Sequence, residues 1–281
     1  MTLEPTQAQR TQMQKIKPGK LALVQFFAIK DQDAFNNYHA TSERAVHQAS
    51  GKCTHSVHVD QMLAGDAMPY QAITIDLFPS SEALLNAFDA LNAERKQAFS
   101  QIYAIIVHPG RKPIRAVKAL GFLSPIMSRI LGTNTEKEMT RFPEVANHHT
   151  GPVPETVSEM RKHDQSTPFY MMNLNKYYPQ AQYANGEKVT GEQAYNRYGN
   201  RIVPYLISVG GYPDIFGHPV GLLVGDENSP LHDDWSDFVM VYYPSRRNFI
   251  RMMSNSPMKG VHHRDAGLQR AVLMPSSEWG K

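Results

Sequence analysis

The motif His262-His263-Arg264 combines a proton-transfer group with a permanent cation just before the last predicted strand. Adjacent side chains point in different directions, so we expect at most one of the two histidines to face an internal cavity. A histidine titrates near neutral pH, and a neighbouring guanidinium can anchor an anion. The motif therefore predicts an acid–base site in which His263 transfers protons and Arg264 holds the negative end of a ligand. The structural alternative pairs Arg264 with Asp265 or uses it to cap helix carbonyls.

Two tyrosines, Tyr195 and Tyr198, fall on the inward face of a helix predicted over residues 191–209. Aromatic side chains at helical spacing are usually core residues. A buried tyrosine must still place its hydroxyl, and a cavity wall would satisfy it with substrate or water. Arg201 follows Tyr198 by one turn and could hold a carboxylate, or stay solvated at the surface. Tyr198 is thus a candidate catalytic residue, and Tyr195 and Arg201 are candidate binding residues.

A third histidine, His218, lies in the second strand region of the same half, within Gly217-His218-Pro219. It is a further candidate acid–base group near Trp235, although histidine also occurs in such turn-like sequence for local reasons. Met172, Asn173 and Trp235 are predicted to line the same pocket.

The single cysteine, Cys53, would share a strand face with His55 because strand side chains alternate with period two. A Cys–His nucleophile pair is conceivable. A small buried thiol is favoured instead, because nothing nearby in the sequence supplies an acid to orient the histidine. His55 and His58 alternate to opposite faces, and His148-His149 has no obvious partner. We therefore expect no metal site.

Several functional classes lose their usual sequence support. The chain has no G-x-x-x-x-G-K-[ST], no G-x-G-x-x-G after a strand, no G-x-S-x-G and no H-E-x-x-H. Its formal charge of +3 is too small to imply a nucleic-acid surface. No stretch approaches the roughly 18 apolar residues of a membrane span, and the first twenty residues lack the apolar core of a signal peptide. These observations predict a cytoplasmic protein without a nucleotide, metal or nucleic-acid partner.

A long repeat dominates the organisation of the 281 residues. Residues 34–38 (AFNNY) recur as residues 194–198 (AYNRY), an offset of 160. Residues 78–80 recur as 243–245, and His108-Pro109 recurs as Met274-Pro275. Solenoid units run to roughly 50 residues at most, so a repeat this long predicts two copies of one small domain.

Each copy reads as β-α-β-β-α-β, the ferredoxin-like plan. Unit 1 is predicted over residues 20–110, after a polar lead at 1–19. It has strands at 20–29, 52–62, 72–78 and 102–108, and helices near 35–49 and 81–98. Unit 2 is predicted over residues 168–276, before a tail at 277–281. It has strands at 169–174, 237–243 and 270–274, a second strand that ends at 220–224, and helices at 191–209 and 246–253. Helices cover one face of each sheet, so the other faces should pack together as an intramolecular α/β barrel of the α+β class.

A partly helical linker is predicted over residues 111–167. Its first part, residues 111–131, has an apolar side and no acidic residue, and its basic residues are Arg111, Lys112, Arg115, Lys118 and Arg129. Such a helix can lie on an anionic membrane. The favoured interpretation is a helix packed across the barrel or in a subunit contact, because Pro125 shortens it and its charges are few. Membrane contact is therefore not expected, and liposomes should leave the protein in the supernatant.

The C-terminal unit resembles domain-of-unknown-function family 1330, within the dimeric α/β-barrel superfamily. The likeness covers roughly residues 168–275 and is carried by residues 172–174, 191–199, 235–237, 243–249 and 263–268. Unit 1 matches only through the repeat, with Asn37 in place of Arg197 and His39 in place of Gly199. Relatives in the superfamily include cofactor-free monooxygenases, lactone isomerases, polyketide cyclases and haem-binding enzymes. The resemblance therefore implies the barrel and leaves the reaction open.

The leading prediction is a small-molecule enzyme that works without a cofactor, by proton transfer on an apolar or aromatic substrate. Its cavity should lie in unit 2, bounded by Tyr198, Trp235 and His263. Two alternatives stay open: a non-catalytic small-molecule or lipid-binding protein, and a haem protein with His263 or His218 as axial ligand. A homodimer of the two-domain chain is also conceivable.

Overall fold

The computed structural model describes residues 3–110, 114–137, 149–255 and 258–279. Over these ranges, eight strands form one closed barrel. They are β1 (Leu21–Ile29), β2 (Lys52–Val59), β3 (Ala72–Phe78), β4 (Phe99–Pro109), β5 (Phe169–Tyr177), β6 (Tyr212–Val224), β7 (Asp237–Tyr243) and β8 (Leu268–Glu278). Their order around the barrel is β1-β3-β2-β8-β5-β7-β6-β4.

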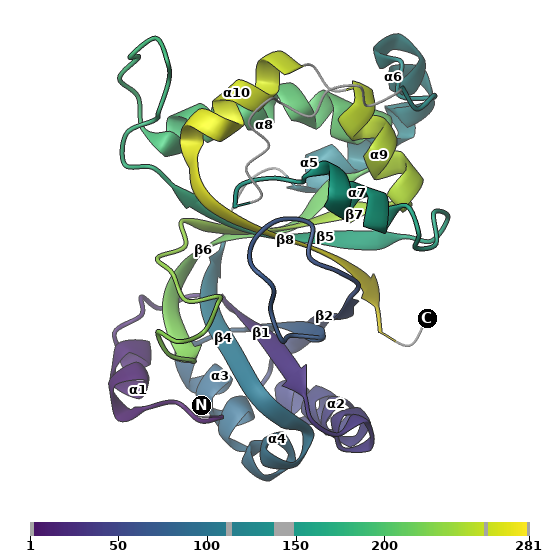
Figure 1. The fold of residues 1–281 in the computed structure, drawn as a ribbon. Coiled ribbons are helices and arrows are strands. Elements are labelled where there is room, and N and C mark those ends of the chain that lie inside the picture. Colours follow the sequence, from purple (N-terminus) through teal and green to yellow (C-terminus); the bar gives the residue numbers. More distant parts are fainter. Residues whose placement is uncertain (1–2, 111–113, 138–148, 256–257, 280–281) are drawn as a thin grey trace.

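Helices cover the outer face of each four-stranded sheet, above and below the barrel in the view of Figure 1. Unit 1 carries α2 (Gln32–Gln48), α3 (Ser81–Asp89) and α4 (Asn92–Ala98). Unit 2 carries α8 (Gly191–Ser208), α9 (Arg246–Asn255) and α10 (Met258–Gly267). The polar lead forms α1 (Gln7–Gln14), and the linker contains α5 (Ile114–Ala119), the 3-10 helix η1 (Leu120–Leu123), α6 (Ser124–Leu131) and α7 (Pro154–Met160).

The strand order confirms the predicted fold class. Within unit 1 the sheet runs β4-β1-β3-β2, and within unit 2 it runs β8-β5-β7-β6. Both are the ferredoxin-like order produced by β-α-β-β-α-β. The pairings β2–β8 and β4–β6 join the two sheets edge to edge. The architecture is thus that of the dimeric α/β barrels, with both ferredoxin-like units in one chain.

The helix repeat is preserved down to its last hydrogen bonds. Gly51 N donates to Val46 O at 2.8 Å, and Gly211 N donates to Leu206 O at 2.9 Å, at the same offset of 160. The residue before each glycine is left-handed, with φ of 57° at Ser50 and 76° at Gly210. This geometry ends a helix and favours glycine, so Ser50 adopts it at some strain.

Strand register corrects one part of the predicted repeat. The first strands are equivalent because Leu21 pairs with Phe78 and Phe169 pairs with Tyr243. On the other side of these strands, Ala22 pairs with Val107 in β4, and the equivalent Tyr170 pairs with Ser276 in β8. Val107 is therefore equivalent to Ser276, and the sequence match of His108-Pro109 with Met274-Pro275 is wrong by three residues.

Other boundaries also differ from the sequence prediction. The helix predicted at 81–98 is divided at Ala90 and Leu91 into α3 and α4, and a second helix, α10, follows α9 in unit 2. Strand β8 runs to Glu278, because its end pairs with β2 across the unit boundary. Residues 277 and 278 are thus barrel residues and not tail.

Three large apolar clusters make up the core. One fills the barrel interior between the sheets and includes Val24, Phe26, Met172, Trp235 and Met274. A second lies between the sheet of unit 1 and its helices, and the third lies in the corresponding place in unit 2. No helix in the described ranges is long and apolar enough to cross a membrane.

Candidate functional site

A cluster of buried polar side chains lies on the helix-covered face of the unit 2 sheet. Asn175 and Asp237 are 1% and 2% exposed, and Asn175 Nδ2 donates to Asp237 Oδ1 at 2.8 Å. The Tyr177 hydroxyl donates to the other carboxylate oxygen of Asp237. Strand alternation explains the placement, because Met172 and Leu174 point into the barrel, so the odd-numbered residues of β5 point outward.

Helix α8 adds two tyrosines to these strand residues. A capping box of Thr190 and Gln193 starts the helix, so its inward face begins near the sheet. Asn175 Nδ2 lies 3.4 Å from the Tyr195 hydroxyl, and the Tyr195 ring lies 5.2 Å from that of Tyr177. The Tyr198 ring follows at 5.5 Å from Tyr195. We call Asn175, Tyr177, Tyr195 and Asp237 the Asp237 cluster.

Two glycines bring α8 and α10 close enough to cover the cluster. A Cβ on Gly191 would lie 2.3 Å from Tyr178 O and 2.6 Å from Gly267 O. A Cβ on Gly267 would in turn lie 2.6 Å from Gly191 O. Only glycine allows so close an approach of the two backbones. The crossing positions Arg264 of α10 near enough for its charge to act on both Tyr195 and Tyr198.

The environment keeps the tyrosine hydroxyls protonated. Burial raises the pKa of Tyr195, and the negative charge of Asp237 raises it further. The pKa of Tyr177 is raised by the same two causes in the same order. Burial also raises the pKa of Tyr198, while Arg264 opposes that shift. At neutral pH these hydroxyls can donate hydrogen bonds, whereas loss of the proton to form a phenolate is disfavoured.

His263 lies on another flank of α10. Its side chain is 7% exposed, and its Nδ1 lies 2.5 Å from the Tyr183 hydroxyl. Its Nε2 is buried and makes no hydrogen bond to any described residue. Burial lowers the pKa of His263, followed by the charges of His262, Arg201 and Arg197. The imidazole is therefore neutral at pH 7 and suited to accept a proton.

The structure brings together only part of the predicted site. Tyr195, Tyr198 and Arg264 share one environment beneath α8 and α10. Met172 and Trp235 lie in the barrel interior, where Trp235 Nε1 donates to Leu231 O at 2.7 Å. The sheet therefore separates them from the tyrosines, and the structure does not bring Tyr198, Trp235 and His263 around one cavity.

The other predicted residues have separate surroundings. His218 is exposed on β6, with Nδ1 3.1 Å from Ser236 O. Asn173 Nδ2 donates to Met171 O and Val239 O, so this amide binds the strand backbone. Arg201 is exposed on α8, and its charge acts on His263.

Sequence reasoning missed three members of the Asp237 cluster. We predicted that the first strand of unit 2 ends at Leu174, whereas β5 runs on to Tyr177. The alternation of Asn173, Asn175 and Tyr177 was the available signal, since it predicts one polar strand face. Asp237 is the first residue of β7, the neighbour of β5 in the sheet, and it pairs directly with Asn175.

Unit 1 fills the equivalent position with hydrocarbon. Phe27 pairs with Ala72 at the start of β3, as Asn175 pairs with Asp237 at the start of β7. The Phe27 ring stacks on Phe99 at 4.3 Å and meets Tyr38 edge-on at 5.6 Å. The Asp237 cluster is thus a feature of unit 2 alone at this position.

A β-bulge overturns the predicted shared face of Cys53 and His55. The register shifts between them, so Cys53 packs toward the helices of unit 1. His55 instead reaches across one mouth of the barrel, where Nε2 lies 2.9 Å from Asp214 Oδ2. Burial and the nearby Asp76 raise the pKa of Cys53 to about 12, so the thiol stays protonated. No group of three or more His, Cys, Asp or Glu that could hold a metal occurs in the described ranges.

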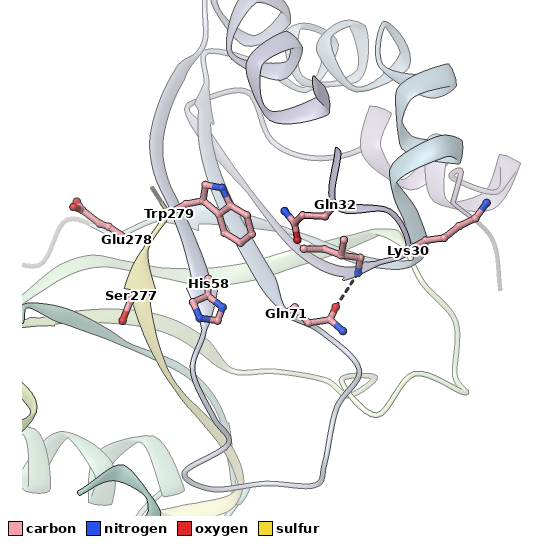
Figure 2. A pocket seen from close by; sticks show the side chains of 8 residues that line it. Lys30, Gln32, His58, Gln71, Ser277, Glu278 and Trp279 are labelled. Carbon is pink, nitrogen blue, oxygen red and sulfur yellow. Dashed lines mark hydrogen bonds between the residues drawn. The ribbon is translucent and has the colours of Figure 1, made fainter. Parts of the chain in front are cut away.

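A cavity of about 650 Å³ lies at the junction of the two units. Figure 2 shows Trp279, at the end of β8, beside Gln32 of unit 1, with His58 and Gln71 below them, and Lys30 at the far side of the cavity. The Trp279 ring meets Phe35 edge-on at 4.5 Å, and Gln71 Oε1 accepts from Ile29 N at 2.8 Å. We predicted Trp279 in a C-terminal tail and did not predict this cavity.

Comparison with solved structures finds similar folds. A protein of unknown function from Rhodopseudomonas palustris is 27% identical and covers 45% of this chain and 94% of its own, with a TM-score of 0.41. Chlorite dismutase from Candidatus Nitrospira defluvii, in complex with imidazole, is 11% identical and covers 95% and 94%, with a TM-score of 0.46. A candidate monooxygenase from Lactobacillus acidophilus is 10% identical and covers 92% and 93%, with a TM-score of 0.43. No protein-family model and no curated protein matches the chain.

Proposed function

We propose that the chain is a small-molecule enzyme that performs acid–base chemistry in unit 2, on an apolar or aromatic substrate with an enolisable or lactone-like centre. One observation carries the proposal. The Asp237 cluster buries a carboxylate and an amide beside the half-buried Tyr177 and Tyr195, at a position where unit 1 has stacked phenylalanine rings. A buried hydrogen-bonded pair can be replaced by apolar side chains of the same shape with little change in stability, so a polar pair at only one of two equivalent positions points to a functional role.

The proposed roles follow from the protonation states. Tyr198 and Tyr195 would donate hydrogen bonds to an oxygen that gains negative charge, since burial keeps both hydroxyls protonated. Arg264 would balance that charge. Asn175 and Asp237 would be positioning residues that fix the Tyr195 hydroxyl and its neighbour Tyr177. His263 would be the proton acceptor, because its lowered pKa leaves it neutral at pH 7.

The resemblance to family 1330 supports the same assignment and forms part of the proposal. Its carrying residues include Gly191, Tyr195 and Tyr198 on α8, together with Asp237 and Gly267. These are the residues that make the glycine crossing and the cluster beneath it. We therefore propose that unit 2 belongs to that family and that this cluster is its site.

The test begins with a thermal-shift screen of small aromatic ketones, enols and lactones, because a specific ligand stabilises the fold by mass action. Turnover of each stabilising compound is then followed by NMR. We expect Tyr198→Phe and Asp237→Asn to lower kcat/KM by about 100-fold or more, the usual contribution of a positioned acid or base. The unit 1 counterpart, Tyr38→Phe, should leave kcat/KM within about twofold and serves as the matched control.

Three outcomes would contradict this assignment. A stabilising ligand that is never turned over would favour the non-catalytic binder. Equal losses of kcat/KM from Tyr38→Phe and Tyr198→Phe would remove the distinction between the units. Loss of ligand binding from Trp279→Ala, with binding unchanged in Asp237→Asn, would move the site to the junction cavity.

A haem protein is the second candidate, and one observation favours it. His263 is buried with Nδ1 held by Tyr183, and its Nε2 has no hydrogen-bond partner among the described residues, which suits an axial ligand. Haem would supply redox chemistry that the side chains lack. Protein expressed with added iron and haem precursor should then show a Soret band that His263→Ala abolishes. A colourless protein that binds no added haem would exclude this candidate.

A further inference from the structure

The linker carries an exposed apolar stripe. The large apolar side chains that are exposed in the described ranges all lie in η1 and α6, namely Leu120, Phe122, Ile126 and Ile130. Phe122 and Ile130 are each 76% exposed, and Ile126 between them is 60% exposed. Phe122, Ile126 and Ile130 follow one another at four-residue spacing, so they lie on one face of the helical segment. Exposed apolar side chains gathered in this way mark an interaction surface.

The opposite side of the same segment is fixed to unit 2. The Ser124 hydroxyl donates to Ser208 O at 2.9 Å, and the Thr133 and Ser208 hydroxyls lie 2.7 Å apart. Gly132 ends α6 in the left-handed conformation, with φ of 73°. The helix is therefore held against α8 by polar contacts while its apolar side faces away, so the exposure is a property of the docked helix.

Proline does not weaken this segment as the sequence suggested. Pro125 stands in the first turn of α6, where its missing N–H has no helical partner to lose. It starts a separate helix instead of shortening a longer one. Pro125 is therefore compatible with a helix at the protein surface.

The sequence that contains the stripe is basic. Between Arg111 and Thr135 the sequence has five basic residues and no acidic one. Two of the basic residues, Lys118 and Arg129, are exposed in the structure. Lys118 also lies over the Tyr212 ring, with Nζ 4.6 Å from its centre, which ties α5 to the barrel. An apolar stripe with basic flanks is the pattern of a helix that lies in the surface of an anionic membrane.

We propose that η1 and α6 dock the protein on the surface of a bilayer that contains anionic lipids. Phe122, Ile126 and Ile130 would enter the boundary between headgroups and acyl chains, and Lys118 and Arg129 would contact lipid phosphates. A second copy of the chain fits this surface less well. A two-fold contact would bring the same basic residues of both copies together, and like charges repel.

Vesicle sedimentation at about 0.15 M salt tests the proposal, since charge attraction is screened but persists there. We expect the protein to sediment with vesicles of phosphatidylcholine and phosphatidylserine, and to stay in the supernatant with phosphatidylcholine alone. The variant Phe122→Ser/Ile130→Ser should weaken binding at least tenfold, and Arg129→Glu should weaken it severalfold. Lys188→Glu, the same charge change on an exposed loop of unit 2, should not alter binding.

The same variants decide against the proposal if they behave otherwise. Absence of sedimentation with the anionic vesicles would overturn it, and so would equal binding to both vesicle types. If Phe122→Ser/Ile130→Ser instead abolishes a dimer seen by analytical ultracentrifugation, the stripe binds a second copy. A melting temperature unchanged from the parent shows that each variant is folded, because these side chains are exposed.

Discussion

The two units place different chemistry at the same point of one scaffold. Where β1 pairs with the start of β3, Phe27 lies among aromatic rings from α2 and β4. Where β5 pairs with the start of β7, Asn175 and Asp237 form a hydrogen-bonded pair beneath Tyr195. The strand order and the C-terminal end of the first helix are the same in both. The fold therefore accommodates either apolar or polar side chains at this position. The apolar ones make unit 1 structural here, and the polar ones make unit 2 a candidate site.

The helical layers differ in the same sense. In unit 1 the long helix α2 packs aromatic side chains directly on the sheet. In unit 2 the contact between α8 and α10 at Gly191 and Gly267 holds the two helix backbones together. The sheet of unit 2 carries the Asp237 cluster beneath these helices, beside its own apolar cluster.

The largest expected effect comes from transferring the unit 2 residue into unit 1. Phe27→Asn should lower the free energy of unfolding by about 5 kcal/mol, because it removes a fully buried ring and strands an amide in an apolar cluster. Urea unfolding measures this loss. The exposed control Phe122→Asn should change stability by about 0.5 kcal/mol at most. A loss below about 1 kcal/mol for Phe27→Asn would show that the two faces are interchangeable.

A second prediction uses a buried carboxyl of unit 1. Asp76 is 6% exposed, and burial raises its pKa to about 7, opposed by a hydrogen bond from Cys53. Its counterpart in unit 2 is the apolar Val241, since Leu23 pairs with Asp76 and Met171 pairs with Val241. The unfolded carboxyl loses its proton near pH 4, whereas the folded one keeps it until about pH 7.

Folding therefore takes up a proton between these pH values, and the Asp76 contribution to stability falls as pH rises from about 4 to about 7. The fall is on the order of 4 kcal/mol for a shift of this size. Asp76→Asn should remove it, so the stability difference between the variant and the parent should grow in favour of the variant from pH 5 to pH 8. Urea titrations at both pH values measure the difference. A pH-independent difference would place Asp76 in contact with water.

The smallest effect distinguishes two glycines of α8. Gly191→Ala should lower the free energy of unfolding by about 1–3 kcal/mol, because the added Cβ meets backbone atoms of Tyr178 and Gly267. Gly199→Ala should raise it by about 0.5–1 kcal/mol, since nothing lies within 4 Å of that Cβ and alanine favours a helix. Thermal and urea unfolding of the two variants measure both changes in the free energy of unfolding. Equal effects would mean that the crossing of α8 and α10 is not tight.

Part of the candidate site was readable from sequence. Helical periodicity put Tyr195 and Tyr198 on the inward face of α8, where the structure has them near Asn175. Alternation could also have separated Met172 from Asn173, because neighbours on a strand point to opposite faces. Grouping Trp235 with Tyr198 was an error of another kind. Trp235 lies in the loop before β7. Packing across the barrel decides which face of the sheet this loop covers, and no local sequence pattern predicts it.

The sequence by itself determined the repeat, the ferredoxin-like order of each unit and the need to bury one face of each sheet, since these follow from local periodicity and from hydrophobic burial. Tertiary structure decided how the strand edges joined. The pairing of β8 with β2 made Glu278 part of the barrel and brought Trp279 against Phe35. It also decided that Asp237 lies beside Asn175, because register aligns residues that are 62 positions apart in the chain. Contacts between distant residues depend on the closure of the whole barrel, and for that reason the polar cluster appears only in three dimensions.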